Sequence, residues 1–235
     1  MSAPTPDAGR GPAPVPLRDA ATLILYRREA ETFRVLMGQR GASAVFMPQK
    51  FVFPGGALDA GDGAILPDRP HDPETRARLE VETPPDVAHA LPYTAVRELW
   101  EETGVLLGRA GAPPEGSVPP PGWAGFLATG QVPDVRALQF VFRAVTPPGR
   151  PRRFDARFFL LDAGEAGLDA EDFARADGEL SHLQWLEIHE ARRLPLPFIT
   201  EIVLSELEAR FAAPHRPRPV PFFDHRAEGS HFLML

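Results

Sequence analysis

Three glutamates lie close together in the middle of the chain, in the stretch AVRELWEETGV at positions 95–105. On a helix, Glu98, Glu101 and Glu102 share one face, because they are three and four residues apart. Gly104 is the expected end of this helix, and acidic side chains in a last turn oppose the helix dipole by roughly 0.3–1 kcal/mol each. Their mutual repulsion costs roughly another 0.2–0.5 kcal/mol per pair. The cluster therefore needs either a compensating partner or full exposure to water.

A divalent cation is the partner that these residue types suit. Carboxylate oxygens are hard ligands that match Mg²⁺ or Mn²⁺, and such ions usually keep some waters and bridge to substrate phosphates. Arg97 precedes Glu98 directly and is placed to pair with one carboxylate and fix its orientation. The alternative interpretation of the glutamates alone is a solvated acidic helix face.

The surrounding sequence favours the first interpretation. Residues 97–105 match the pattern R-E-U-x-E-E-x-G-U, in which U is a bulky apolar residue. Upstream, PGGALDAGD is similar to the pattern G-x₅-E from Gly56 to position 62. Together these segments resemble the two halves of the Nudix box. With FMPQKFVFPGG and RRFDARFFL, they resemble the Nudix branch that contains the peroxisomal coenzyme A diphosphatases, over roughly residues 19–212.

The chain departs from the family pattern in two places. Position 62 is Asp where the family has Glu, and the shorter side chain leaves the role of Asp62 open. Thirty-four residues separate Asp62 from Arg97, whereas the family has seven. We interpret the excess as a Pro-rich insertion at 63–91, with one short helix capped by Asp72 and with Pro73 in its first turn. A long ordered loop of this kind is often functional, so it is a candidate to shape the substrate pocket.

The resemblance implies an α/β fold, a Nudix-type α/β/α sandwich around a mixed sheet. The coarse pattern agrees, because β-rich runs lie on both sides of a single central helix expected from Pro92 to Thr103. A turn at Gly55 and Gly56 is expected to use backbone conformations closed to other residues. The expected strands are 21–29, 32–40, a short run near 50–53, ALQFVFRAV, RRFDARFFLLDA and ELSHLQWLEI, and PFITEIVLSELEARFA is expected to be a helix.

The predicted organisation is one Nudix domain at 19–212, between a flexible Pro/Ala-rich tail at 1–18 and a Pro-rich segment at 213–235. The sequence has no cysteine, which excludes disulfides and thiolate metal sites. A net charge of −7 argues against general binding to nucleic acid. No secretory signal and no apolar run of about 18 residues is visible, so we expect a cytoplasmic protein without membrane contact.

The resemblance also implies the reaction and its residues. The family hydrolyses a nucleoside diphosphate linked to another group, with Mg²⁺ or Mn²⁺ as cofactor. For this chain, coenzyme A or a derivative is a candidate substrate. Carried over by position, Glu98, Glu101 and Glu102 are the expected metal ligands, and one of them is a candidate to activate water. The backbone carbonyl of Gly55 would complete the metal shell, and Arg97 would orient the acids.

Three further residues are candidates for the site. Glu179, in ELSHLQW, is a candidate metal ligand or general base, or alternatively a surface residue at the start of a strand. Arg157 is a candidate phosphate contact, or alternatively an arginine on the wet face of a strand. Gly56 is a candidate substrate contact.

Two other classes of function stay open. The protein could be a Nudix-fold module that senses a nucleotide without cleaving it, or an interaction protein whose Pro-rich tails and insertion recruit partners. The complete set of three glutamates argues against a sensor, because a sensor does not need the metal geometry.

Overall fold

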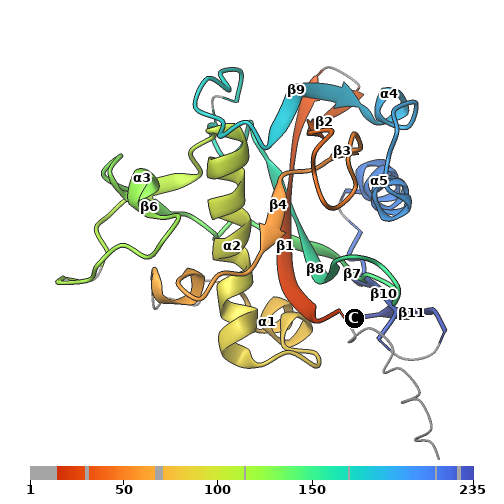
Figure 1. Cartoon of the computed structure of the whole chain (residues 1–235), viewed down its shortest axis with the longest axis horizontal. Coiled ribbons are helices and arrows are strands. Elements are labelled where there is room, and N and C mark those ends of the chain that lie inside the picture. The colour runs from red at the N-terminus through yellow and green to blue at the C-terminus, as the bar shows by residue number, and fades with distance from the viewer. Residues whose placement is uncertain are drawn as a thin grey trace, which may run out of the picture.

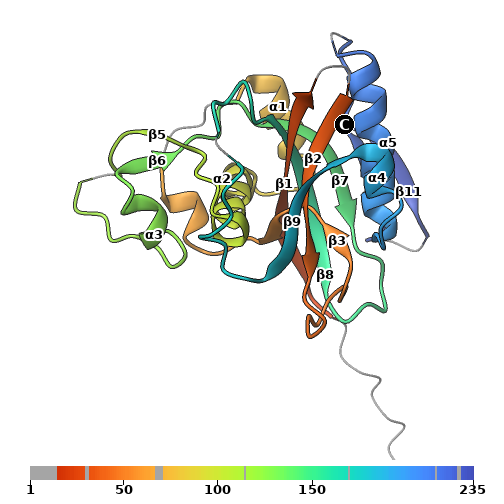
Figure 2. The same ribbon diagram turned by 90° about the horizontal axis from the view of Figure 1, so that it is seen from above.

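A computed structural model describes residues 15–29, 32–66, 71–113, 115–168, 170–214, 216–226 and 229–235. It has a mixed β-sheet with helix α2 (Pro85–Thr103) on one face and helices α4 (Ile188–Ala191) and α5 (Phe198–Ala212) on the other (Figures 1 and 2). The expected α/β/α sandwich is therefore confirmed. A small lobe with helix α3 (Ala124–Leu127) and the two-stranded sheet β5–β6 (Gly108–Ala110 and Gln131–Pro133) lies beyond α2 (Figure 2).

The main sheet has the strand order β11-β10-β7-β8-β1-β2-β3, and β4 also pairs with β1 and β9 with β2. The parallel pair β1–β8 is its centre, with Leu23, Ile24 and Leu25 fully buried in β1. The strands of this sheet are β1 (Leu17–Glu29), β2 (Thr32–Arg40), β3 (Phe51–Val52), β4 (Gly55–Ala57), β7 (Gln139–Val145), β8 (Arg153–Asp162), β9 (Leu180–Glu187), β10 (Pro221–Asp224) and β11 (His231–Met234).

Both ends of the domain differ from the expected boundaries. Strand β1 begins at Leu17, inside the predicted tail, and residues 1–14 of that tail lie outside the described residues. At the other end, the segment at 213–235 contributes β10, which runs parallel to β7, and β11, which pairs with β10. This segment extends the sheet because Val220 and Phe222 are buried in the core.

Helix α2 corrects the expected start at Pro92. The helix begins seven residues earlier, with Pro85 in its first turn, where the missing N–H of proline costs nothing. Pro92 lies inside the helix, a position that removes one backbone hydrogen bond. Apolar burial compensates, since Leu91, Tyr93 and neighbouring side chains of α2 are almost completely buried.

The predicted insertion therefore contains the first two turns of α2 as well as its own elements. A single 3₁₀ turn, η1 (Asp62–Ala64), lies where the insertion begins, and helix α1 (Pro73–Leu79) follows. The predicted cap of α1 is confirmed, because Asp72 Oδ1 accepts hydrogen bonds from the backbone N–H groups of Glu74 and Thr75 at 2.9 and 3.0 Å. Helix α1 lies beside the N-terminal end of α2 (Figure 1), far along the helix from the glutamates.

Two buried arginines tie the α1–α2 connection to the sheet. Arg143 on β7 and Arg157 on β8 are register partners, and both are about 1% exposed. Arg143 Nη1 donates to the carbonyl of Val81 at 2.7 Å, and Arg157 Nη2 donates to Thr83 Oγ1 at 2.6 Å. Asp155 lies between the two guanidinium groups and accepts two bonds from Arg143 at 2.9 and 2.7 Å.

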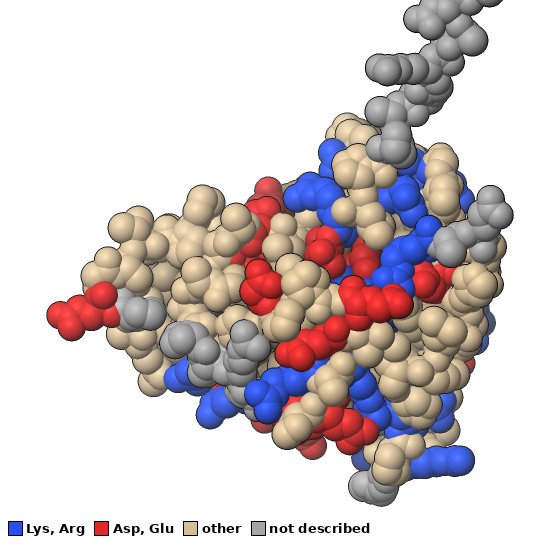
Figure 3. All heavy atoms as spheres, turned by 90° about the horizontal axis from the view of Figure 1, so that it is seen from below, with Lys and Arg blue, Asp and Glu red and all other residues tan. Residues whose placement is uncertain are grey.

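Helix α5 covers the second face of the sheet as its sequence pattern predicts. Val203 and Leu207 are fully buried, and Ile199, Ile202 and Phe211 pack against the same apolar cluster. Among the described residues, no helix combines the length and the apolar character that a membrane span requires. On the described part of the face in Figure 3, acidic and basic side chains intermingle, which gives no continuous basic surface for nucleic acid.

Candidate active site

The three glutamates lie in the last two turns of α2, next to strand β4. Gly104 ends the helix with a left-handed φ of 74°, as predicted, and its N–H donates to the carbonyl of Trp100 at 2.8 Å. Glu102 is 2% exposed, and its Oε2 accepts a hydrogen bond from the backbone N–H of Gly55 at 2.8 Å. Strand β4 and the end of α2 therefore form one unit.

The backbone conformation of the two glycines of β4, Gly55 and Gly56, differs from the expected turn. Both lie in an extended strand, and neither is among the described residues with positive φ. Their small size is needed for space instead. A Cβ atom at Gly56 would lie 2.4–2.5 Å from the carboxylate of Glu98, and one at Gly55 would lie 2.7 Å from Ala21 O and Thr22 Oγ1. The glycines allow β4 to lie directly against the acids and β1.

Arg97, which the resemblance assigns to orient the acids, donates hydrogen bonds to two of them. Its Nη1 donates to Glu98 at 2.9 Å and to Glu101 at 3.1 Å. Its Nη2 donates to the carbonyl of Ala57 at 3.0 Å, so the guanidinium also contacts β4. Burial alone would lower the pKa of Arg97, but the surrounding carboxylates raise it, and Arg97 stays charged.

Asp62 anchors the other side of Arg97, which answers the question that its shorter side chain raised. It is fully buried, and it accepts hydrogen bonds from Arg97 Nε at 2.8 Å and from Arg97 Nη2 at 3.0 Å. Burial opposes its ionisation, but the hydrogen bonds and charge of Arg97 outweigh that effect and hold the pKa of Asp62 below its usual value. Both halves of the split box therefore meet despite the insertion.

The glutamates have the opposite electrostatic character. Burial raises the pKa of Glu98 to about 7, with the charges of Glu101 and Glu179 adding to the shift and Arg97 opposing it. Burial and the neighbouring Glu98 raise the pKa of Glu102 well above its usual value, and burial also raises the pKa of Glu101. This part of the protein thus holds more carboxylate than its own cations neutralise.

Glu179 lies at the same end of α2, just before β9. Its carboxylate accepts a hydrogen bond from Arg40 Nη2 at 2.8 Å, and its side chain is 53% exposed. The charge of Glu179 contributes to the raised pKa of both Glu98 and Glu102, so its carboxylate lies near theirs. Arg40, at the end of β2, is a site residue that the sequence pattern did not reveal.

The structure does not bring Arg157 to this site. Arg157 Nη1 donates to Asp19 at 2.6 Å, and its Nη2 donates to Thr83, just before the N-terminal end of α2. Glu98 lies thirteen residues after Pro85, about 20 Å further along the helix axis. The contacts of Arg157 serve the fold, and the exposed strand position considered from sequence is wrong because Arg157 is buried.

The acids fit a hard divalent cation in their chemistry and in their charge. Carboxylate oxygens crowded in a buried place with raised pKa values are the condition that a dication relieves. Within the described ranges, however, no three His, Asp or Glu side chains are grouped ready to hold an ion. Hydrogen bonds hold the three glutamate carboxylates apart, because Glu98 and Glu101 accept from Arg97 whereas Glu102 accepts from the backbone N–H of Gly55.

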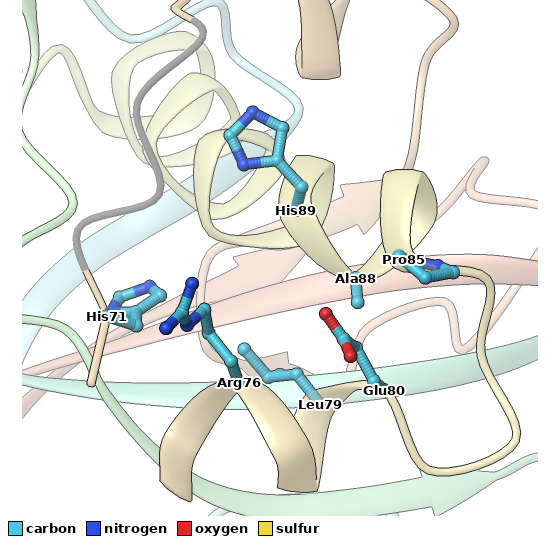
Figure 4. Close-up of a pocket in the computed structure, with 7 residues that line it drawn as sticks. All are labelled: His71, Arg76, Leu79, Glu80, Pro85, Ala88 and His89. Carbon is cyan, nitrogen blue, oxygen red and sulfur yellow. The ribbon is translucent and has the colours of Figure 1, made fainter. Parts of the chain in front are cut away.

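Two hollows lie along α2 outside the acidic cluster. An open hollow of about 520 Å³ lies at its C-terminal end. A cavity of about 20 Å³, the volume of roughly one water molecule, lies between α1 and the N-terminal part of α2 (Figure 4). The open hollow is lined by Trp100, Gly104, Leu106, Gly125, Ala128, Thr129, Gln131 and Arg175. The small cavity is lined by His71, Arg76, Leu79, Glu80, Pro85, Ala88 and His89.

A mixed sheet between helices, with a glutamate-rich helix end held by arginine and aspartate against a glycine strand, defines a Nudix domain. The chain belongs to the Nudix superfamily. Its structure is similar to that of a NUDIX hydrolase from Alicyclobacillus acidocaldarius, with a TM-score of 0.61, 28% identity, and coverage of 85% of this chain and 97% of the other.

Two curated relatives extend the comparison. Human acyl-coenzyme A diphosphatase NUDT19 is 32% identical over 213 residues, which cover 69% of this chain and 55% of the relative. Putative nudix hydrolase 7 of Caenorhabditis elegans is 31% identical over 186 residues, which cover 74% of this chain and 52% of the relative. The chain thus spans about half the length of these relatives. No family model matches the chain.

Proposed function

We propose that this protein hydrolyses the diphosphate linkage of a nucleoside diphosphate joined to another group, with coenzyme A and its derivatives as the first candidate substrates. The observation that carries the proposal is the cluster of three glutamates beside β4, in which Arg97 holds Glu98 and Glu101 and the backbone N–H of Gly55 holds the buried Glu102. The substrate class is supported by the name of the human relative, an acyl-coenzyme A diphosphatase.

Mg²⁺ or Mn²⁺ is the proposed cofactor, held by Glu98, Glu101, Glu102 and the carbonyl of Gly55. When bound, such an ion supplies charge neutralisation at the diphosphate and lowers the pKa of a bound water. The chain's own contribution is orientation: Arg97 holds Glu98 and Glu101 through two hydrogen bonds from one nitrogen. Gly56 is the proposed substrate contact, because it lies directly against the carboxylate of Glu98, one of the proposed metal ligands.

Glu179 is the proposed general base or additional metal ligand. Its exposure gives water access to the carboxylate, and Arg40 fixes one of its oxygens at 2.8 Å. The charge of Arg40 also acts on Glu102, where it opposes the rise in pKa that burial causes, so Arg40 connects Glu179 with the end of α2. A cytoplasmic location stays a prediction from the sequence.

The test compares Glu101→Gln and Glu102→Gln with wild type on a panel of coenzyme A, acyl-coenzyme A, ADP-ribose and dinucleoside polyphosphates. Release of nucleoside or pantetheine monophosphate is measured with Mg²⁺, with Mn²⁺ and with a chelator. We expect kcat to fall roughly 100-fold in both variants, because each loses a metal-ligand charge. Glu208→Gln on α5, on the opposite face of the sheet, is the matched control and should retain turnover.

Equal turnover in wild type and both site variants would discard the metal assignment. Binding without turnover is the second candidate function, and it is favoured by the hydrogen bonds with which Arg97 and Gly55 already engage the three glutamates. Calorimetric binding of a panel compound by wild-type protein that cleaves none of the panel would support a nucleotide-sensing or partner-binding module instead.

A further inference from the structure

Trp123 lies outside both halves of the Nudix box but contacts its buried aspartate. The indole Nε1 donates a hydrogen bond to Asp62 Oδ1 at 2.9 Å, across 61 positions of sequence. Trp123 is fully buried and packs edge-to-face on Phe126, with ring centroids 5.4 Å apart. An indole N–H in such a place needs a partner, and the carboxylate of Asp62 provides it.

Thr94 contacts the same carboxylate from α2. Its Oγ1 donates to Asp62 Oδ2 at 2.8 Å, and the backbone N–H of Asp59 donates to the same oxygen at 3.0 Å. With the two bonds from Arg97, five donors therefore surround one fully buried carboxylate. Each oxygen is fixed from two or more directions, so Asp62 has one orientation.

This arrangement matters because Arg97 has a rigid, planar guanidinium. Asp62 binds Nε and Nη2 on one side of the fork, and the opposite nitrogen, Nη1, contacts Glu98 and Glu101. Any rotation of Asp62 would therefore rotate the nitrogen that holds the two glutamates. Backbone next to Trp123 also approaches these groups, since a Cβ at Gly122 would lie 2.7 Å from Glu101 Oε1 and from the Arg97 side chain.

We propose that Trp123 and Thr94 are positioning residues that adapt the site to an aspartate at position 62. A glutamate would reach one methylene further toward Arg97, whereas the shorter Asp62 is held in place by an indole and a hydroxyl from outside the usual pattern. Trp123 acts through Asp62 and Arg97 on the glutamates and does not itself touch substrate. The kinetic consequence depends on the proposed function, but the hydrogen-bonding consequence does not.

The kinetic test uses Trp123→Phe, which keeps an aromatic ring and removes the N–H. We expect kcat to fall about tenfold, in line with the loss of one hydrogen bond to a charged group, while KM stays within twofold. Trp185→Phe is the matched control, because the indole of Trp185 donates to the carbonyl of Ala170, away from Arg97. It should keep the wild-type kcat.

Rescue separates positioning from a general loss of packing. In the double variant Asp62→Glu/Trp123→Phe, the longer acid occupies part of the space that the indole leaves, and kcat should recover at least threefold over Trp123→Phe. Equal kcat in wild type and Trp123→Phe, an equal loss in Trp185→Phe, or no recovery in the double variant would overturn the proposal. If Trp123→Phe does not fold, Thr94→Val takes its place in the same comparison.

A second readout does not require activity. In NMR spectra of the full chain, the Arg97 Nε–H should exchange slowly with water in wild type and in Trp185→Phe. It should exchange at least tenfold faster in Trp123→Phe. Unchanged exchange would overturn the proposal, whether or not wild type cleaves any compound. Absence of turnover with altered exchange would instead count against the proposed function alone.

Discussion

At the scale of single residues, the partners of a buried carboxylate decide the direction in which its pKa shifts. Asp62 and Glu102 are both almost completely buried, but Asp62 accepts five hydrogen bonds and Glu102 accepts one from Gly55. The hydrogen bonds and the charge of Arg97 outweigh burial and lower the pKa of Asp62, whereas burial and the charge of Glu98 raise the pKa of Glu102. In the sequence motif both residues are simply acidic positions. The motif therefore predicted that they lie close together, but not that their pKa values shift in opposite directions.

Gly56→Ala tests the close contact between β4 and the acids. The added Cβ would lie 2.4–2.5 Å from the carboxylate of Glu98, which must then move. The displaced carboxylate would no longer be in position for the reaction, so we expect kcat to fall roughly 100-fold. Because only the end of a flexible side chain has to move, the melting temperature should stay within a few degrees of wild type. Gly125→Ala is the control, since its Cβ would meet only Trp100 Nε1 at 3.7 Å. Full activity of Gly56→Ala would contradict the contact.

At the scale of elements, the sequence predicted most of the strands and the ends of helices, because these depend on local signals. Strand β2 occupies the expected residues 32–40, and the caps of α1 and α2 at Asp72 and Gly104 are as predicted. The start of α2 was wrong because a proline can begin a helix or lie within one, and only tertiary burial decides between these cases. Arg157 was misplaced because strand alternation does not show which face a neighbouring loop covers.

Replacement of Arg157 distinguishes its structural contacts from the phosphate contact expected from sequence. Arg157→Leu leaves Asp19 and Thr83 without their buried partner and removes one of the two guanidinium groups beside Asp155, so the free energy of unfolding should fall by roughly 3–5 kcal/mol. In the folded fraction, KM should equal the wild-type value. Arg150→Leu, at an exposed position of the β7–β8 loop, is the control for urea unfolding and kinetics. A raised KM with unchanged stability would restore the phosphate role.

At the scale of the whole molecule, the chain keeps two distant halves of a motif in register through buried contacts. Asp62 and Arg97 are 35 positions apart, but their side chains are 2.8 Å from each other. The segment between them is held at 81–83 by Arg143 and Arg157, together with an ion pair between Glu82 and Arg226 from the C-terminal segment. Neither the position of this segment beside the N-terminal end of α2 nor the extra strands β10 and β11 could be predicted, since both depend on long-range pairing.

The balance of charge in the site predicts how the stability of the whole protein depends on pH and on metal. Burial raises the pKa of Glu98 from 4.5 to about 7, so between these values the native state binds more protons than the unfolded chain. Without metal, the contribution of Glu98 to the free energy of unfolding should therefore fall as pH rises from about 4.5 to about 7, by at most about 3 kcal/mol. The raised pKa values of Glu101 and Glu102 act in the same direction.

A dication that binds the ionised acids reverses this trend, because its affinity grows as protons leave. Urea unfolding at pH 5 and pH 8, with a chelator and with Mg²⁺, should show a larger Mg²⁺ stabilisation at pH 8. Glu98→Gln cannot ionise at this position, so its stability should depend less on pH than that of wild type, whereas Glu208→Gln should retain the wild-type dependence. Equal stabilisation by Mg²⁺ at both pH values would mean that the ion binds elsewhere, and the crowded glutamates at the end of α2 would then need another physical explanation.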